Sequence, residues 1–157
     1  AAALYILREV APMWKHRTVL AGKRPSAELT DAAAGLRHVK LIPNPPVNHM
    51  DELIANAQVC LLNASQPTGM KLKLINALCS GRHVVTSPAV VSGSGLGSLC
   101  HTAVKPEEWI TLTDTLMREE FTAEMRNDRN LLLKEVADNE VNARRIIEAI
   151  DTYNPEN

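Results

Sequence analysis

Short apolar runs alternate with helical patterns along most of this chain, and that alternation restricts its fold more than any other feature. Four runs have the length and composition of buried strands: residues 17–22, 38–42, 57–63 and 83–87. The segment 100–104 could add an edge strand. Strands that alternate with helices form parallel sheets, because the crossover between two parallel strands is usually a helix lying on the sheet. We therefore expect a Rossmann-like three-layer α/β/α sandwich with a mostly parallel sheet.

The stretches between these runs carry helix signals. Helices are expected over 1–14, over 26–35, from Asn48 or His49 to about 56, over 68–81, from 106 onward and over 139–153. Thr68 is expected to be an N-cap, and Gly81 to end the same helix. The Ser- and Gly-rich segment 88–98 is expected to be a loop. No repeat or linker interrupts the pattern, so residues 1–157 are expected to form one domain.

Composition and charge exclude several classes of function. The chain has 157 residues, enough for one hydrophobic core, and its 45% hydrophobic and 22% charged residues are typical of a folded domain. Lys and Arg number 17 against 18 Asp and Glu, so no overall field attracts nucleic acid or an anionic membrane. No apolar run reaches the roughly 18 residues of a membrane helix, so we expect neither a membrane span nor an export signal. We expect a cytoplasmic protein.

The cysteines and histidines give no metal signature. Cys60, Cys79 and Cys100 lie in apolar stretches without zinc-binding spacing and are expected to be buried free thiols. The five histidines are scattered along the chain. The glycines of 92–98 do not follow a first strand, so they do not make a dinucleotide fingerprint. Neither a metal nor a cofactor is expected.

The segment 66–87 contains residues suited to holding an anion. Ligands of parallel sheets bind beyond the carboxyl ends of the strands. The N–H groups of Gly69, Met70 and Lys71 would face out of the helix start, where the helix dipole favours negative charge. A phosphate site is therefore plausible at this point.

A polar stripe continues along the same helix. At about 100° per residue, Gly69, Lys73, Asn76 and Ser80 fall on one side, and apolar residues cover most of the rest. Asn76 stands roughly 10 Å along the axis from Gly69. That distance suits a ligand whose two polar ends are joined by a diphosphate.

The same helix also has a purely structural interpretation, which the pattern alone favours. A buried helix between two strands needs only apolar residues and a cap, and Lys71 and Lys73 can be solvated. Asn76 is a modest argument for a ligand, because an amide in an apolar stretch is disfavoured unless something bonds to it. Lys23 follows Gly22 at a strand end and could add positive charge, although a solvated loop residue is the commoner role.

An ordered series of segments resembles the signature region of retaining glycosyltransferases with the GT-B fold, the group 1 or family 4 class. The run ALCSGRHVV at 77–85 resembles the end of the family's motif helix and the strand after it. Upstream, the strands and the helix that lead into the motif are matched by VLAGKRP at 19–25, HVKLIPNP at 38–45 and MDELIANAQVCLLNAS at 50–65. The resemblance covers roughly residues 17–104.

This resemblance implies the C-terminal, nucleotide-sugar-binding half of a GT-B enzyme. The implied reaction transfers a hexose from a UDP- or GDP-sugar to a glycan or lipid-linked acceptor. An N-terminal acceptor domain of the same protein is the implied partner, and residues 1–157 alone are expected to be inactive. For the full-length protein, peripheral attachment at the inner face of a membrane stays open. No nucleic acid is expected as a partner.

Two departures from the family pattern affect the site. Aligned on Gly81, the family's two glutamates fall at Thr68 and Asn76, so neither carboxylate is present. The resemblance places the first position at the donor sugar and the second at the ribose, where Asn76 can offer only an uncharged amide oxygen. The candidate nucleotide-sugar-binding residues are Thr68, Gly69, Lys71, Lys73, Asn76, Gly22 and Lys23. No catalytic residue is assigned.

Two other functions remain as alternatives. A non-catalytic GT-B-like binding module would explain why both motif glutamates are replaced. Another Rossmann-like binder, such as a sugar-nucleotide epimerase or a response-regulator-like module, is the third hypothesis. The missing early Gly-rich loop counts against the epimerase, and the missing acidic cluster at the strand ends counts against the response regulator.

Overall fold

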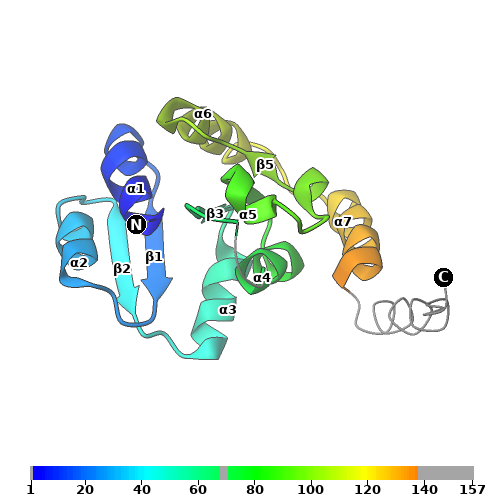
Figure 1. The fold of residues 1–157 in the computed structure, drawn as a ribbon, viewed down its shortest axis with the longest axis horizontal. Helices are drawn as coiled ribbons and strands as arrows, with labels where there is room; N and C mark the ends of the chain where they lie inside the picture. Colours follow the sequence, from blue (N-terminus) through cyan, green and yellow to red (C-terminus); the bar gives the residue numbers. More distant parts are fainter. Residues whose placement is uncertain (1, 68–70, 138–157) are drawn as a thin grey trace, which may run out of the picture. The chain divides into compact units, whose positions relative to one another are not determined.

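The computed structural model describes residues 2–67 and 71–137 (Figure 1). The predicted helix over 139–153 and the candidate residues Thr68 and Gly69 lie outside these ranges. The chain divides into two compact units, Ala1–Glu120 and Phe121–Asn157. The expectation of one domain stays a prediction, because compact units can be parts of a single domain.

All strands of the described residues are parallel to their neighbours and lie at the predicted places. In the first unit, β1 (Thr18–Gly22) pairs with β2 (Val39–Pro43), with Thr18 opposite Val39. A second sheet has the order β3 (Val59–Leu62), β4 (His83–Thr86), β5 (His101–Thr102). The sequence predicted one sheet, and within the described residues the strands form two. The α/β fold class is confirmed.

Helices follow the strands as predicted, with ends set by local chemistry. Helix α2 (Ala27–Ala34) is capped by Ser26, whose hydroxyl accepts a hydrogen bond from the N–H of Leu29, and Gly35 ends it. The α-helices that follow α2 in this unit are α3 (Val47–Asn56), α4 (Leu72–Ser80), α5 (Pro88–Val91) and α6 (Pro106–Leu116). Segment 88–98, expected to be a loop, begins with the short α5 because Ser87 and Pro88 favour a helix start.

The N-terminal segment is helical but irregular. Helix α1 (Ala2–Tyr5) passes into a π-helical turn, Ile6–Val10, and then a 3₁₀ turn, Ala11–Met13. Pro12 has no N–H group, so a regular α-helical bond back to residue 8 is impossible there. The segment still buries Leu7 and Val10, as the predicted amphipathic helix required.

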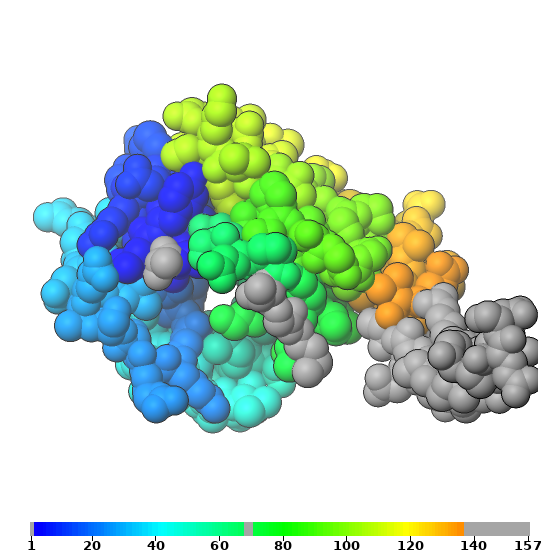
Figure 2. Space-filling view, viewed as in Figure 1, coloured from blue at the N-terminus to red at the C-terminus, as the bar shows by residue number. Residues whose placement is uncertain are grey.

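One hydrophobic core serves both sheets. Its fully packed members are Val10, Ala11, Trp14, Val85, Ala103, Trp109 and Leu116. Val39 of β2 and Val59 of β3 both pack against this cluster. In Figure 2 the N-terminal segment (blue) lies against α6 (yellow-green), which carries the completely buried Trp109. The core therefore fixes the helices relative to the strand ends that hold the candidate site.

The second unit contains α7 (Ala123–Ala137). Thr122 accepts a hydrogen bond from the N–H of Met125 at the start of this helix. The guanidinium groups of Arg126 and Arg129 lie 5.3 and 4.5 Å from the centre of the Phe121 ring, which places both in cation–π range. These contacts stabilise the first turns of α7.

Candidate functional site

Helix α4 begins later than the sequence predicted. Lys71 is the N-cap residue, with φ −82° and ψ 33°, and the first helical bond runs from the N–H of Ile75 to the carbonyl of Lys71. The prediction that Thr68 caps this helix is therefore wrong. The free N–H groups of the first turn belong to Leu72, Lys73 and Leu74. A residue-type rule selected Thr68, but the helix begins where the Lys71 backbone leaves the helical region.

The exposed face of α4 carries the predicted polar stripe. Lys73, Asn76 and Ser80 are exposed, whereas Leu74, Ala77 and Leu78 are buried. The expectation of apolar burial around most of the helix is wrong, because Leu72 is 56% exposed and Cys79 is exposed. A helix with a buried face of period 3.6 leaves the opposite residues in solvent.

The Lys71 ammonium lies between the segment that follows β3 and the short helix α5 that follows β4. Its Nζ donates to the carbonyl of Pro67 and to the carbonyl of Ala89, each at 3.3 Å. An ammonium has three protons, and these two bonds are the ones it makes to residues 2–67 and 71–137. Lys73, two residues later in the sequence, is exposed on α4. The two lysines place positive charge at the helix start, where the dipole already favours an anion.

A buried serine joins the ends of β3 and β4. The Ser87 hydroxyl accepts from the N–H of Ala64 at 3.0 Å and donates to the carbonyl of the same residue at 3.1 Å. Beside it, the Asn63 amide donates to the carbonyl of Ala2 at 3.1 Å. Sequence reasoning missed both residues, although each is the last residue of a predicted strand (57–63 and 83–87) and follows the observed strand, β3 or β4, at its carboxyl end.

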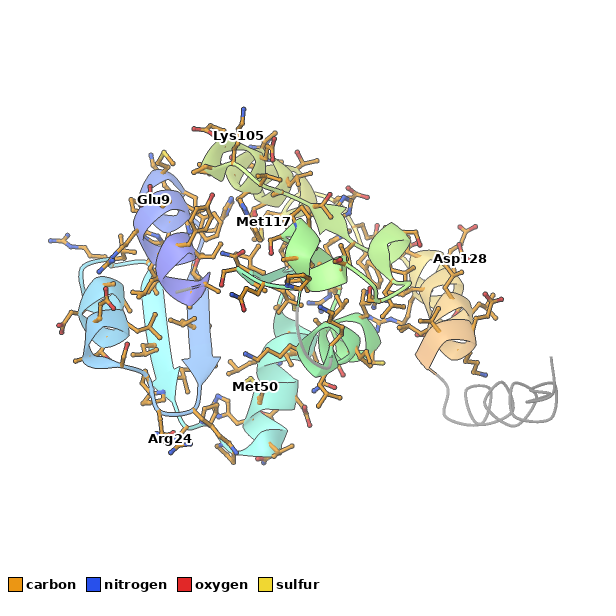
Figure 3. All side chains as sticks on the ribbon, in the orientation of Figure 1. Glu9, Arg24, Met50, Lys105, Met117 and Asp128 are labelled. Carbon is orange, nitrogen blue, oxygen red and sulfur yellow. The ribbon has the colours of Figure 1, made fainter. Side chains whose placement is uncertain are left out.

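The loops after β1 and β2 are joined in a similar way. Asn44 donates its main-chain N–H to the carbonyl of Gly22, and its side-chain oxygen accepts from the N–H of Arg24, both at 2.8 Å. Arg24 and Asn44 have positive φ values of 45° and 51°. Arg24 lies at the tip of this loop in Figure 3, and Lys23 beside it is exposed. An Asn between prolines is a left-handed turn signal that could have identified Asn44.

The structure assembles part of the predicted site. Lys71, Lys73 and Asn76 lie together at the start and on the exposed face of α4. Gly22 and Lys23 lie at the carboxyl end of β1, and no hydrogen bond or ion pair within residues 2–67 and 71–137 links them to α4. The binding roles of all these residues stay predictions.

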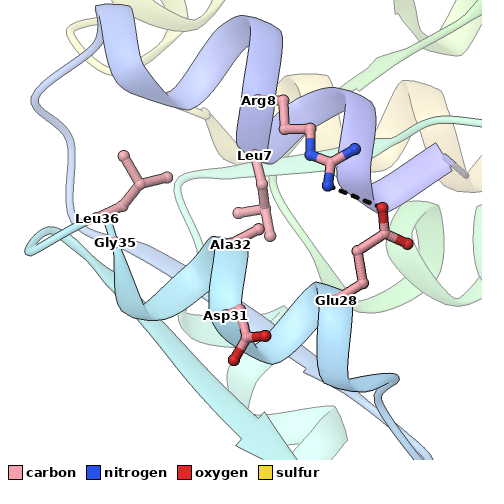
Figure 4. Close-up of a pocket in the computed structure, with 7 residues that line it drawn as sticks. All are labelled: Leu7, Arg8, Glu28, Asp31, Ala32, Gly35 and Leu36. Atoms are coloured by element: carbon pink, nitrogen blue, oxygen red, sulfur yellow. Dashed lines mark hydrogen bonds and ion pairs between the residues drawn. The ribbon is translucent and has the colours of Figure 1, made fainter.

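A shallow hollow lies elsewhere, between the N-terminal helical segment and α2. It has a volume of 360 Å³ and is lined by Leu7, Arg8, Glu28, Asp31, Ala32, Gly35 and Leu36. Arg8 and Glu28 form an ion pair of 2.8 Å across it (Figure 4). Both side chains are more than half exposed, so the pair contributes little stability. None of the predicted site residues lines this hollow.

In the described parts of the chain, no three His, Cys, Asp or Glu side chains are grouped to hold a metal ion. None of the described helices has the length and apolarity needed to cross a bilayer.

The chain forms a Rossmann-like α/β domain. The parallel strands, the helices between them and the basic helix start at the strand ends define this class. Comparison with known families then identifies it further. Residues 1–118 match the family described as Glycosyl transferases group 1. The chain belongs to this glycosyltransferase family. No curated protein matches the chain.

Proposed function

We propose that this chain is the donor-binding domain of a glycosyltransferase that moves a hexose from a nucleoside-diphosphate sugar to a glycan or lipid-linked acceptor. Such a reaction belongs to polysaccharide biosynthesis. The observation that carries the proposal is the position of the Lys71 ammonium, which is 3.3 Å from the Pro67 and Ala89 carbonyls and places a positive charge at the start of α4, where an anion is favoured. Membership of the glycosyltransferase family supports a nucleotide-sugar donor as that anion.

Each candidate residue has a proposed role in this site. Lys71 and Lys73 neutralise the diphosphate, aided by the N–H groups of the first turn of α4. Asn76 stands one helical turn beyond Leu72, about 6 Å along the axis, and its exposed amide can bond to a ribose hydroxyl. Thr68 and Gly69 remain proposed for the sugar and phosphate sides. Gly22 and Lys23 remain proposed as contributors from the loop after β1.

The acceptor is proposed to bind to a second domain. In this proposal an N-terminal domain of the same protein holds the acceptor and closes over the donor, so residues 1–157 bind the nucleotide sugar without completing transfer. A cytoplasmic location, with or without attachment to the inner face of a membrane, is part of the same proposal.

Calorimetric titration of residues 1–157 with UDP, GDP and their hexose derivatives tests donor binding. We expect binding below millimolar concentration for one of the two nucleotides, weakened by Lys73→Met because a charge beside the diphosphate is lost. Lys40→Met is the matched control, since Lys40 is an exposed lysine of β2. A folded chain that binds none of these ligands below millimolar concentration contradicts the proposal.

A binding module without catalytic activity is the second candidate. The observation that favours it is the uncharged Asn76 on the exposed face of α4, at the position where the resemblance implies a glutamate. A full-length protein that binds nucleotide sugar but neither transfers nor hydrolyses it, with a panel of glycan and lipid-linked acceptors, would support this function. Measurable transfer would exclude it.

A further inference from the structure

Ser87 occupies an unusual position between the two strand ends of the candidate site. It directly follows β4 and is only 9% exposed. Its main-chain N–H donates to the carbonyl of Leu62, the last residue of β3, at 3.1 Å. Its hydroxyl both donates to and accepts from the backbone of Ala64. Ser87 therefore holds the chain as it leaves β3 against the end of β4.

The other end of the same segment is also attached near Ser87. Lys71 donates to the carbonyl of Ala89, two residues after Ser87, at 3.3 Å. Between these residues, the Ser87 carbonyl accepts from the N–H of Val90 and so fixes the first turn of α5. Ala64 and Lys71 are thus both bonded to residues 87–89. The start of α4, with Lys73 and Asn76, comes directly after Lys71.

The hydroxyl has no substitute in these contacts. An alanine at position 87 would remove both bonds to Ala64 and leave a half-buried N–H and carbonyl without their protein partner. Threonine keeps a hydroxyl in the same place, and cysteine keeps the size of the side chain but bonds more weakly. Whether the two hydrogen bonds to Ala64 form therefore depends on the hydroxyl of residue 87 and not on its side-chain volume alone.

We propose that Ser87 is a positioning residue for nucleotide-sugar binding. It does not contact the ligand in this proposal. It fixes the exit of β3 so that Lys71 and the first turn of α4 present their positive charge together to the diphosphate. The inference rests on the proposed function, since it names the residue that holds the backbone of the same nucleotide-sugar site in place.

The test compares Ser87→Ala, Ser87→Thr and a matched control, Ser94→Ala. The Ser94 hydroxyl also donates to one backbone carbonyl and accepts from one backbone N–H, at Val91 and Leu96, and neither bond involves residues 64–67 or 71. Affinity for UDP and GDP is measured by calorimetry. Amide hydrogen exchange is measured at residues 64–67 and 71–75, and the thermal midpoint is measured for each variant.

We expect Ser87→Ala to weaken nucleotide affinity about fivefold or more and to speed exchange in the segment. Ser87→Thr should restore the parent's nucleotide affinity and exchange rates. Ser94→Ala should change neither the affinity nor the exchange rates, even if it lowers the thermal midpoint as much as Ser87→Ala does. Equal affinity of Ser87→Ala and the parent, or equal loss in Ser94→Ala, overturns the proposal. If Ser87→Ala does not fold, the same comparison is made with Ser87→Cys.

The two proposals fail in different ways. A parent chain that binds neither nucleotide contradicts the proposed function, whatever the exchange data show. Exchange rates at residues 64–67 and 71–75 that are identical in Ser87→Ala and the parent contradict the positioning role, whether or not nucleotide binds.

Discussion

The side-chain oxygen of Asn44 accepts a hydrogen bond from the main-chain N–H of Arg24 at 2.8 Å, so the loops that follow β1 and β2 are joined at their tips. Both residues have left-handed backbone conformations, which asparagine tolerates better than most residues and arginine does not. The bond thus holds Arg24 in a conformation that it would seldom adopt alone. Such retained strain commonly marks a functional loop.

Asn44→Ala is expected to lower the free energy of unfolding by about 1 to 2 kcal/mol, because it removes the bond to Arg24 and leaves a Cβ at positive φ without compensation. Asn44→Gly also removes the bond, but glycine adopts a positive φ without a steric cost. The loss of unfolding free energy should therefore be smaller than for Asn44→Ala. Urea denaturation of the two variants measures the difference. Equal unfolding free energies for the alanine and glycine variants would show that the positive φ at position 44 has no energetic cost for alanine.

Asn76→Ala is expected to weaken nucleotide binding several-fold while leaving stability almost unchanged. The reason is that Asn76 is exposed on α4, where its amide can bond to a ligand hydroxyl and contributes little to packing. Calorimetric titration and thermal denaturation measure the two effects. Asn48→Ala, on the exposed side of α3, is the control. Unchanged affinity would remove Asn76 from the site.

Gly81→Ala and Gly22→Ala should differ sharply in stability. A Cβ at Gly81 would lie 2.6 Å from the carbonyl oxygen of Ala77 and 3.1 Å from Cys60 Sγ, so the helix end must move. We expect a loss of about 1 to 3 kcal/mol for Gly81→Ala. A Cβ at Gly22 would meet nothing within 4 Å, so Gly22→Ala should be almost neutral. Chemical denaturation tests the contrast, and similar losses in both variants would refute it.

Glu108 should make the stability of the first unit depend on pH. Hydrogen bonds from the main-chain N–H groups of Val104 and Lys105 hold the pKa of Glu108 below its ordinary value. A carboxyl whose pKa is lower in the folded state adds stability above its unfolded pKa and loses it as pH falls through the folded pKa.

Glu108→Gln should therefore lower the thermal midpoint at neutral pH, and the difference from the parent should shrink in acid. Thermal denaturation between neutral pH and pH values below the ordinary glutamate range measures this difference. Glu107→Gln is the control, because Glu107 is the neighbouring acid of the same first turn and accepts neither of these two bonds. A difference that does not change with pH would contradict the prediction.

Much of the fold could be predicted because its signals are local. The strands are short apolar runs whose ends are marked by glycine, proline or polar residues, and Ser26, Gly35 and Gly81 mark helix ends through bonds within a few residues. The exposed position of Asn76 also followed from helical periodicity. The start of α4 could not be predicted in this way, because Lys71 is held by Ala89, which is distant in sequence.

The sequence by itself determined the parallel α/β class, the order of the elements and a polar stripe on α4, since each depends on the spacing of neighbouring residues. Only the tertiary structure decided that Ser87 bonds to Ala64 and that Asn44 bonds to Gly22 and Arg24. Residues that are about 20 positions apart meet only after the strands pair and the core around Trp109 packs. No local sequence pattern predicts these hydrogen bonds, because their geometry depends on the packing of the whole first unit.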